Sequence, residues 1–231
     1  MTPSISSTFF HAAAKPGPVA AARTRHGVAD AWKRGFDVTA AAALCFMLLP
    51  LLLVLFVAVR LSGSSVLFSH QRIGRYGKPF GCLKFRSMRP DADAMLEALL
   101  RSDPAARQEW LATRKLRNDP RITRIGRFLR TTSLDELPQL FNVLRGDMSL
   151  VGPRPVVAAE LVQYYGSEGT AAYEAVRPGI TGLWQVSGRS NLSWDESVRL
   201  DLRYVENWSV LNDLMIMWQT VKVMVRPNGA Y

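Results

Sequence analysis

Residues 38–59 read VTAAAALCFMLLPLLLVLFVAV, an uncharged run of 22 residues that contains Pro50. As one helix the run would extend about 33 Å, at about 1.5 Å per residue, which is close to the thickness of a bilayer's hydrocarbon core. It starts too far along the chain and is too long for a secretory signal, and it lacks a small-residue cleavage site. The run therefore predicts a membrane-embedded helix rather than the core helix of a soluble domain.

Two topologies fit this helix. Lys33 and Arg34 precede the run and Arg60 follows it, and basic flanks favour the cytoplasmic side of a membrane at both ends. Pro50 removes a backbone hydrogen bond and bends a helix. These features suit a re-entrant helix that enters the membrane, bends at Pro50 and returns to the same face. A kinked helix that spans the membrane fits the residues equally well.

The chain divides around this segment. We expect residues 1–30, rich in Ala, Ser, Thr and Pro, to form a mobile tail. Residues 31–61 would form the membrane helix, and residues 62–231 a domain on the cytoplasmic side. Trp32 and Phe36 are placed for the membrane interface at the start of the helix.

Short β-like pieces in residues 66–89 surround a glycine-containing turn, and residues 91–115 show helical spacing that is split near Asp103. We therefore predict a mixed α/β fold, mostly helical with a few short strands. The apolar stretch 211–225 is too short to span a bilayer and predicts a helix at the interface or docked on the domain. A basic amphipathic helix is predicted where arginines recur every three residues, at Arg121, Arg124, Arg127 and Arg130.

The composition limits the possible partners. The chain has 29 Lys and Arg against 19 Asp and Glu, a formal net charge of +10. This charge suits phosphorylated substrates, acidic lipids or nucleic acid, but no nucleic-acid-binding module is recognisable, so we expect no nucleic-acid partner. The two cysteines, Cys45 and Cys82, lie far apart, and with three histidines they argue against a zinc site or a disulfide-built domain.

Asp135 and Glu136 are adjacent carboxylates in the basic stretch TSLDELPQLFNVLRGDMSLVGPRP (132–155). Such a pair can hold Mg²⁺ or supply a nucleophile. The alternative is helix capping, because Ser133 and Glu136 form the S-x-x-E pattern. Pro138 favours a helix that begins there, with the two carboxylates in the preceding turn. Spacing alone leaves both interpretations open and slightly favours capping.

Several basic residues could bind phosphate. Arg154 stands between two prolines that restrict its backbone, so it would lose little entropy on gripping a phosphate. Lys84 and Arg86 share a face if KFRSM (84–88) is a strand, although a solvated basic edge is the plainer interpretation. The stretch RPGITGLWQVSGR (177–189) could cradle a nucleotide or form a packed turn, and it matches no standard phosphate-loop pattern.

In combination these segments resemble the bacterial sugar transferases, or monotopic phosphoglycosyl transferases. The resemblance covers about residues 32–225, and its most characteristic block is LDELPQLFNVLRGDMSLVGPRP (134–155). It is carried further by KRGFD (33–37), QRIGRYGKPFGCLKFRSM (71–88), RPGITGLWQVSGR and LDLRYVENWS (200–209). The chain looks like the short form that initiates exopolysaccharide repeat units.

The resemblance implies a re-entrant helix broken at Pro50 and a catalytic Asp135–Glu136 pair that works with Mg²⁺. Asp135 would attack the sugar-bearing phosphorus of a UDP-sugar, release UMP and carry an aspartyl-phosphosugar intermediate. Undecaprenyl phosphate would then take the sugar phosphate, and the resemblance implies galactose or glucose as the sugar. The residues expected to bind substrate phosphate are Lys84, Arg86, Arg130, Arg154 and Arg189, with Gln185 and Asp201 as further site candidates.

The resemblance places the enzyme on the cytoplasmic face of a bacterial inner membrane, in contact with its lipids. The residues themselves also allow a non-enzymatic adaptor that binds anionic lipid through Arg121, Arg124, Arg127 and Arg130. Such an adaptor would not need Asp135 and Glu136. The sequence does not decide which sugar is moved, and it leaves the oligomeric state open, with a homodimer as one candidate.

Overall fold

The computed structural model describes residues 28–63, 65–113, 116–188 and 192–225. The apolar run forms two helices, α2 (Val28–Met47) and α3 (Leu49–Leu61), which meet at a bend of 66°. Pro50 lies in the first turn of α3, where its missing N–H has no helical partner to lose. The predicted break is thus confirmed. Among the described helices none could cross a membrane alone, and this bent pair alone has the length and composition to do so together.

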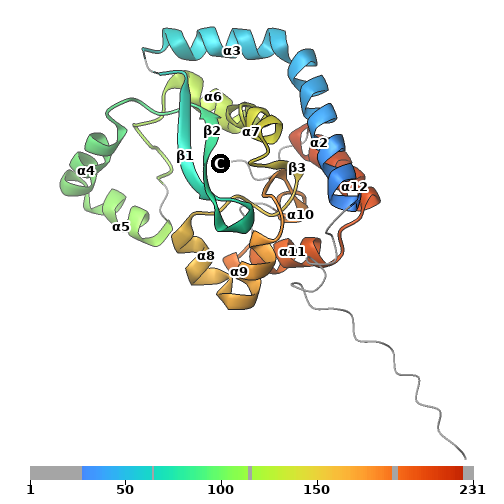
Figure 1. Ribbon diagram of the computed structural model, residues 1–231. Helices are drawn as coiled ribbons and strands as arrows, with labels where there is room; N and C mark the ends of the chain where they lie inside the picture. Colours follow the sequence, from blue (N-terminus) through green and yellow to red (C-terminus); the bar gives the residue numbers. More distant parts are fainter. Residues whose placement is uncertain (1–27, 64, 114–115, 189–191, 226–231) are drawn as a thin grey trace, which may run out of the picture.

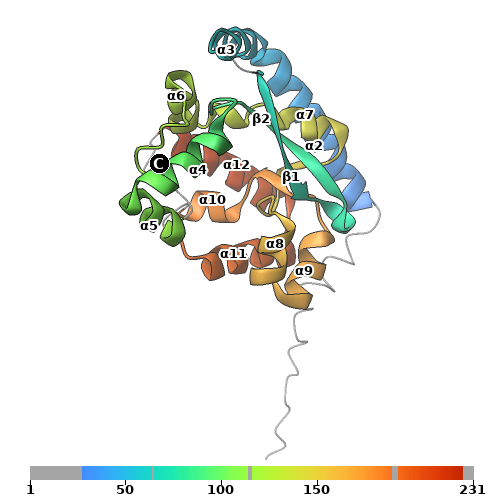
Figure 2. The same ribbon diagram turned by 90° about the vertical axis from the view of Figure 1, so that its left-hand side faces the viewer.

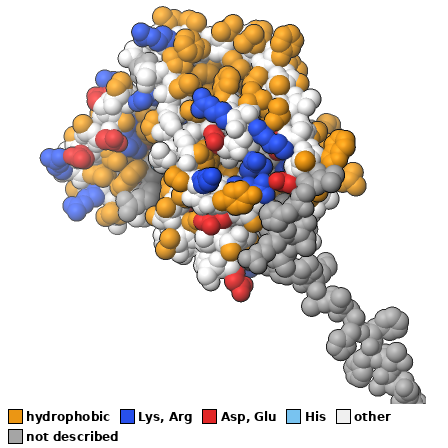
Figure 3. All heavy atoms as spheres, viewed as in Figure 1, with side chains coloured by type: hydrophobic (Ala, Val, Ile, Leu, Met, Phe, Trp, Pro, Cys, Tyr) orange, Lys and Arg blue, Asp and Glu red, His pale blue; other side chains and the backbone are white. Residues whose placement is uncertain are grey.

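Helix α3 runs across one end of the molecule, and α8 (Ala158–Tyr164) and α9 (Gly166–Glu174) lie at the opposite end (Figures 1 and 2). The inner side of α3 buries Leu52, Leu55 and Val59 in an apolar cluster with Phe85 and Leu129. Its outer side exposes large apolar side chains, namely Leu53, Val54, Phe56, Val57 and Leu61. Hydrophobic side chains therefore line this edge of the molecule (Figure 3).

The predicted hairpin is confirmed. Strands β1 (Leu67–Ile73) and β2 (Pro79–Phe85) pair antiparallel, from Leu67 opposite Phe85 to Ile73 opposite Pro79. A one-turn 3₁₀ helix, η1 (Arg75–Gly77), closes the turn. The hairpin leads away from α3, because Phe85 lies in the cluster under α3 whereas the Ile73 N–H donates to Val156 O before α8.

Helices α4 (Ala92–Ser102) and α5 (Pro104–Thr113) form an arm at one side of the molecule (Figure 1). The predicted split is confirmed at Asp103, whose Oδ1 accepts from the N–H groups of Ala105 and Ala106. This carboxylate satisfies orphan donors in the first turn of α5.

The arginine-rich segment forms the predicted helix, except that its first arginine lies before the helix. Helix α6 (Arg124–Thr132) is capped by Thr123, whose side chain accepts from the Gly126 N–H. Arg124 and Arg127 are exposed. Arg121 lies before the helix and is buried, with its Nε and Nη2 at 2.8 and 2.7 Å from the Asp119 carboxylate. The prediction that Arg121 belongs to an open basic face is therefore wrong, because Asp119, two residues before it, pairs with it.

The main core joins segments far apart in sequence. Helix α7 (Gln139–Arg145) leads into β3 (Ser149–Val151), which pairs parallel with β4 (Gly179–Thr181). Around this short sheet pack α10 (Leu183–Ser187), α11 (Trp194–Glu206) and α12 (Val210–Val225). The described residues thus form a mostly helical fold with a few short strands, as predicted, and these strands make two two-stranded sheets.

Polar contacts fix α2 to this core. Asp37 is buried and accepts from Ser149 Oγ at 2.7 Å and from the Leu150 N–H at 3.2 Å. Lys33 donates to Asp213 of α12 at 2.8 Å. Trp32 instead faces outward with 74% of its surface exposed. Helix α2 therefore holds the base of α3 in a defined place on the core.

Helix α12 docks on the core, which is one of its two predicted positions. Asp213 and Ile216 are buried on its inner side. Its outer side keeps a row of apolar side chains exposed, at Leu211, Leu214, Met215, Trp218 and Val221.

Candidate active site

The two adjacent carboxylates lie in a tight turn between helices. Helix α6 ends at Ser133, which adopts the left-handed conformation (φ 57°) that is uncommon for a residue with a side chain. The 3₁₀ turn η2 (Leu134–Glu136) follows, and α7 begins after Pro138. Ser133 makes no side-chain cap, so the capping-box interpretation is wrong. The alternative, a helix that begins at Pro138 with both acids in the preceding turn, is confirmed.

The turn is anchored on the cluster beneath α3. Leu134 and Leu137, which flank the acidic pair, pack against the buried residues Leu52, Leu55 and Leu129. The carboxylates are therefore held beside the apolar end of the molecule while both stay partly exposed.

Lys84 of β2 meets this turn. Its Nζ donates to Glu136 Oε1 at 2.6 Å. Burial opposes the charged ammonium, but the carboxylates of Glu136 and Asp135 outweigh it and raise the pKa of Lys84. The side chain therefore stays a cation in the site.

Burial raises the pKa of Asp135 to about 6, although the charges of Lys84 and Arg130 act in the opposite direction. Arg130, in the last turn of α6, is held by a hydrogen bond from its Nε to Ser87 Oγ at 2.9 Å. Asp135 is thus a partly desolvated carboxylate between two cations, and it is ionised at neutral pH. Ser87 was missed as a supporting residue because nothing in the sequence joins it to Arg130, 43 positions later.

Arg154 is the centre of a second group of residues. Its guanidinium lies between two aromatic rings. It lies 5.1 Å from the Trp184 ring centroid and 5.2 Å from that of Trp194. Trp194 in turn stacks on Tyr164 at 4.7 Å. Trp194 begins α11 and was not predicted as a site residue, because no motif pairs it with an arginine 40 positions earlier.

Asp201 of α11 supports the backbone of Arg154. Its Oδ2 accepts from the Arg154 N–H at 3.2 Å and from the Tyr165 hydroxyl at 2.8 Å. Complete burial raises the pKa of Asp201 to about 7, while these hydrogen bonds and the charge of Arg154 act to lower it. Asp201 therefore belongs with Arg154 and holds the loop that carries it.

The remaining candidates are placed as follows. Arg86 directly follows β2, and its guanidinium lies over the ring of Phe68 in β1, 5.6 Å from the ring centroid. Gln185 lies in α10 beside Trp184. Arg189 lies outside the described residues. The structure thus brings together Lys84, Arg130, Asp135 and Glu136, and it forms a second group from Arg154, Trp184, Gln185 and Asp201.

A metal ion in this site would need ligands from a substrate as well as from the protein. Among the described residues no three His, Cys, Asp or Glu side chains gather to hold an ion. Asp135 and Glu136 offer hard oxygen ligands, and Mg²⁺ is commonly held by one or two carboxylates together with substrate phosphates. The donor set therefore fits Mg²⁺ bridged to a phosphate.

Comparison with known proteins gives consistent matches over most of the chain. The sequence model of a family described as bacterial sugar transferase matches residues 28–227. A UDP-galactose-lipid carrier transferase of Erwinia amylovora is 52% identical over 199 residues, which are 86% of this chain and 41% of that protein. An undecaprenyl-phosphate galactose phosphotransferase of Salmonella typhimurium is 50% identical over the same shares of the two chains.

The exopolysaccharide production protein ExoY of Rhizobium meliloti is 47% identical over all of this chain and 98% of its own length. The chain thus spans about two fifths of the length of the first two relatives and nearly all of the third.

Proposed function

Because this chain belongs to the bacterial sugar transferase family, we propose that it transfers a hexose-1-phosphate from a UDP-sugar to undecaprenyl phosphate and releases UMP. The hexose would be galactose or glucose, and the reaction would be the first membrane step of exopolysaccharide repeat-unit assembly. The names of the relatives support the donor, the lipid acceptor and the polysaccharide product.

One observation carries this proposal: Asp135 sits between Lys84 and Arg130 in a turn whose leucines pack under α3. A carboxylate and a diphosphate repel each other as like charges. Cations beside the carboxylate offset that repulsion and stabilise charge on the phosphates. The position under α3 suits an acceptor whose phosphate is anchored at a membrane surface.

In the proposed reaction a carboxylate oxygen of Asp135 attacks the sugar-bearing phosphorus of the donor. The phosphorus–oxygen bond to UMP breaks, UMP leaves with the electron pair, and the sugar phosphate stays on Asp135. An oxygen of undecaprenyl phosphate then attacks the same phosphorus and restores the free carboxylate. The product is undecaprenyl-diphospho-sugar.

Glu136 and Lys84 would position the reacting groups for this step. Glu136 holds Lys84 beside Asp135, so the cation meets the donor phosphate without losing much side-chain entropy. Asp135 and Glu136 would hold Mg²⁺, which when bound would neutralise charge on the diphosphate and on the departing UMP. Arg130 is fixed by Ser87 and can bind a phosphate oxygen with its remaining N–H groups.

The bent pair α2–α3 would serve as the re-entrant membrane segment. Its outer apolar face and the basic residues at both ends, Lys33, Arg34 and Arg60, fit a helix pair that enters and leaves on the cytoplasmic side of the inner membrane. The exposed apolar row of α12 would rest on the same lipid surface.

A UMP-release assay on the purified protein with undecaprenyl phosphate and a panel of UDP-sugars tests the proposal. Release from at least one UDP-hexose in the wild type, and its loss on chelation of Mg²⁺, is the expected result. Lipid binding with no release from any donor would favour the non-enzymatic adaptor.

A further inference from the structure

Three buried polar atoms around Arg154 lack a hydrogen-bond partner within the described part of the chain. They are Trp184 Nε1, Gln185 Oε1 and Asp201 Oδ1. A buried polar atom without a partner costs free energy, so in a native protein each one needs an explanation, such as a bound molecule. The unpaired Asp201 oxygen is the costliest of the three, because Asp201 is only 3% exposed and carries a carboxylate.

These atoms surround one arginine. The Trp184 ring lies over the Arg154 guanidinium, and Asp201 accepts from the Arg154 N–H with its other oxygen. Gln185 follows Trp184, and its Oε1 would lie 2.7 Å from a Cβ at Gly182. The same Cβ would meet the carbonyl oxygen of Gly152, two residues before Arg154. Trp184 and Asp201 therefore contact Arg154, and the acceptor Gln185 Oε1 lies near the backbone two residues before it.

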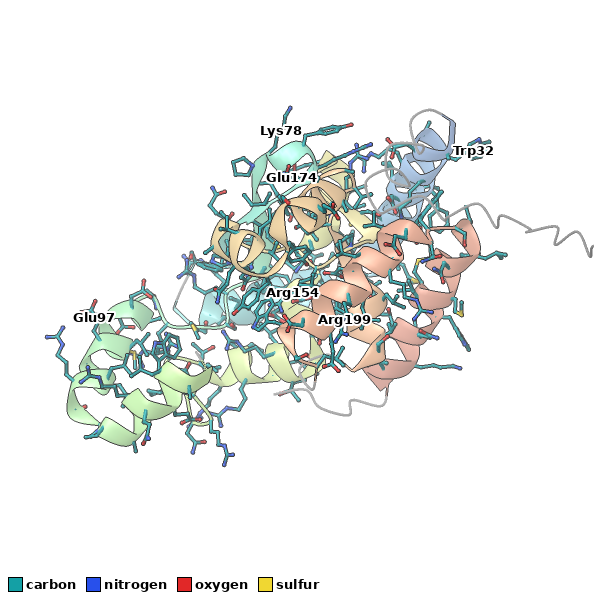
Figure 4. All side chains as sticks on the ribbon, turned by 90° about the horizontal axis from the view of Figure 1, so that it is seen from below. Trp32, Lys78, Glu97, Arg154, Glu174 and Arg199 are labelled. Atoms are coloured by element: carbon teal, nitrogen blue, oxygen red, sulfur yellow. The ribbon has the colours of Figure 1, made fainter. Side chains whose placement is uncertain are left out.

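The group lies at the far end of the hairpin from α3. Lys84 pairs with Phe68 near α3, and Arg72 pairs with Phe80 four residues further along, about 13 Å away at the spacing of a strand. Arg72 is close enough to Arg154 for the two charges to repel. Seen from below, Arg154 lies near the middle of the molecule, whereas Trp32 and Lys78 lie towards its edge (Figure 4).

We propose that Trp184, Gln185 and Asp201, together with Arg154, form the subsite that recognises the uridine half of the donor. This inference rests on the proposed function. The acceptor phosphate would reach Asp135 from the side of α3, because its lipid is in the membrane. The donor therefore extends in the opposite direction, along the hairpin from Lys84 towards Arg154.

The chemistry of the three atoms matches a uracil nucleoside. Uracil presents one N–H between two carbonyl oxygens, so Gln185 Oε1 accepts from the N–H and Trp184 Nε1 donates to a carbonyl. The Asp201 oxygen accepts from a ribose hydroxyl. Arg154, held flat between two rings, offers its guanidinium edge to the phosphate next to the ribose. Cytosine lacks the ring N–H and replaces one carbonyl with an amine, so the same atoms reject it.

The test measures UMP and CMP binding to the full chain in detergent by calorimetry. The wild type should bind UMP at least about tenfold more tightly than CMP, since the mismatched base leaves buried groups unpaired. Trp184→Phe keeps a ring over Arg154 and removes only the N–H, and Gln185→Ala removes the acceptor. Each variant should weaken UMP binding and bring the UMP-to-CMP ratio close to one. Trp218→Phe, on the exposed face of α12, is the matched control and should leave the ratio unchanged.

A ratio that stays at the wild-type value in both variants overturns the subsite assignment, with ordered water then serving the buried atoms. A wild type that binds UMP and CMP equally overturns it as well. Selective UMP binding that the variants lose supports the subsite even where no transfer is detected. Failure of transfer with every UDP-sugar counts against the proposed function alone.

Discussion

Lys84 Nζ lies 2.6 Å from Glu136 Oε1, so a cation whose charge acts on the proposed nucleophile is held by that nucleophile's own neighbour in the chain. The pair joins the second strand of the hairpin to the turn between α6 and α7. Lys84 thus contacts Glu136 directly and also favours the ionised form of Asp135.

Replacement of Lys84 by Met should lower UMP release by about 10²–10³-fold, the usual loss when one electrostatic stabiliser is removed. The pKa of Asp135 should rise above its value of about 6, because a charge that lowers it is gone. The residual activity should therefore shift to higher pH. Steady-state UMP release from pH 5 to 9 measures both effects. Lys78→Met removes an exposed cation at the hairpin turn and should change neither; an unshifted pH profile in Lys84→Met would count against this role.

Asp201 predicts a dependence of stability on pH. Burial raises the pKa of Asp201 from 3.8 to about 7. Between these values the folded protein keeps a proton that the unfolded chain releases, so ionisation of Asp201 lowers stability as the pH rises through that window. Asn at this position does not titrate. Relative to the wild type, Asp201→Asn should become more stable from pH 5 to pH 8, by at most about 3 kcal/mol. Melting temperatures of both proteins in detergent measure this, and a difference that is constant with pH would contradict it.

The buried pair Asp119–Arg121 predicts a large loss of stability. Asp119 and Arg121 each expose 6% of their residue surface. Asp119→Ala would leave the charge of Arg121 buried without its carboxylate partner. The free energy of unfolding should fall by about 3–5 kcal/mol. Asp91→Ala breaks the exposed Arg89–Asp91 pair and should cost less than about 1 kcal/mol. Denaturant unfolding of the two variants checks the contrast, and equal losses would refute it.

The membrane topology can be tested by adding one cysteine at a time, at Trp32 near the start of α2 or at Ser62 directly after α3. If the pair is re-entrant, an impermeant maleimide should label both positions in inverted vesicles and neither in spheroplasts. The unsubstituted chain, with Cys45 and Cys82, gives the background. Labelling of one position from the periplasm would show a spanning helix instead.

Local chemistry made part of the fold predictable. The uncharged run with Pro50, the hairpin turn at Gly74–Gly77 and the split at Asp103 each depend on a few neighbouring residues, and the structure has all three. The parallel pairing of Ser149 with Gly179 was not predicted, because strands 30 residues apart leave no periodic signal. Ser133 was misleading for a related reason. The S-x-x-E pattern is real, but the end of α6 and Pro138 together leave no helix for it to cap.

The site was predictable to a similar extent. Asp135 and Glu136 stood out because two acids interrupt a basic stretch. Their link to Lys84, 52 positions away, depends on how the hairpin packs on α7 and η2. The two tryptophans on Arg154 likewise come from α10 and α11, and only the tertiary fold brings them together.

Covalent catalysis by Asp135 can be detected by an intact-mass measurement on the full chain in detergent, with UDP-hexose and Mg²⁺ and without a lipid acceptor. We expect an adduct with the mass of one hexose phosphate, mapped by peptide analysis to Asp135. The adduct should disappear on addition of undecaprenyl phosphate and should be missing in Asp135→Asn. An active wild type that shows no adduct, or an adduct on another residue, would rule out Asp135 as the nucleophile.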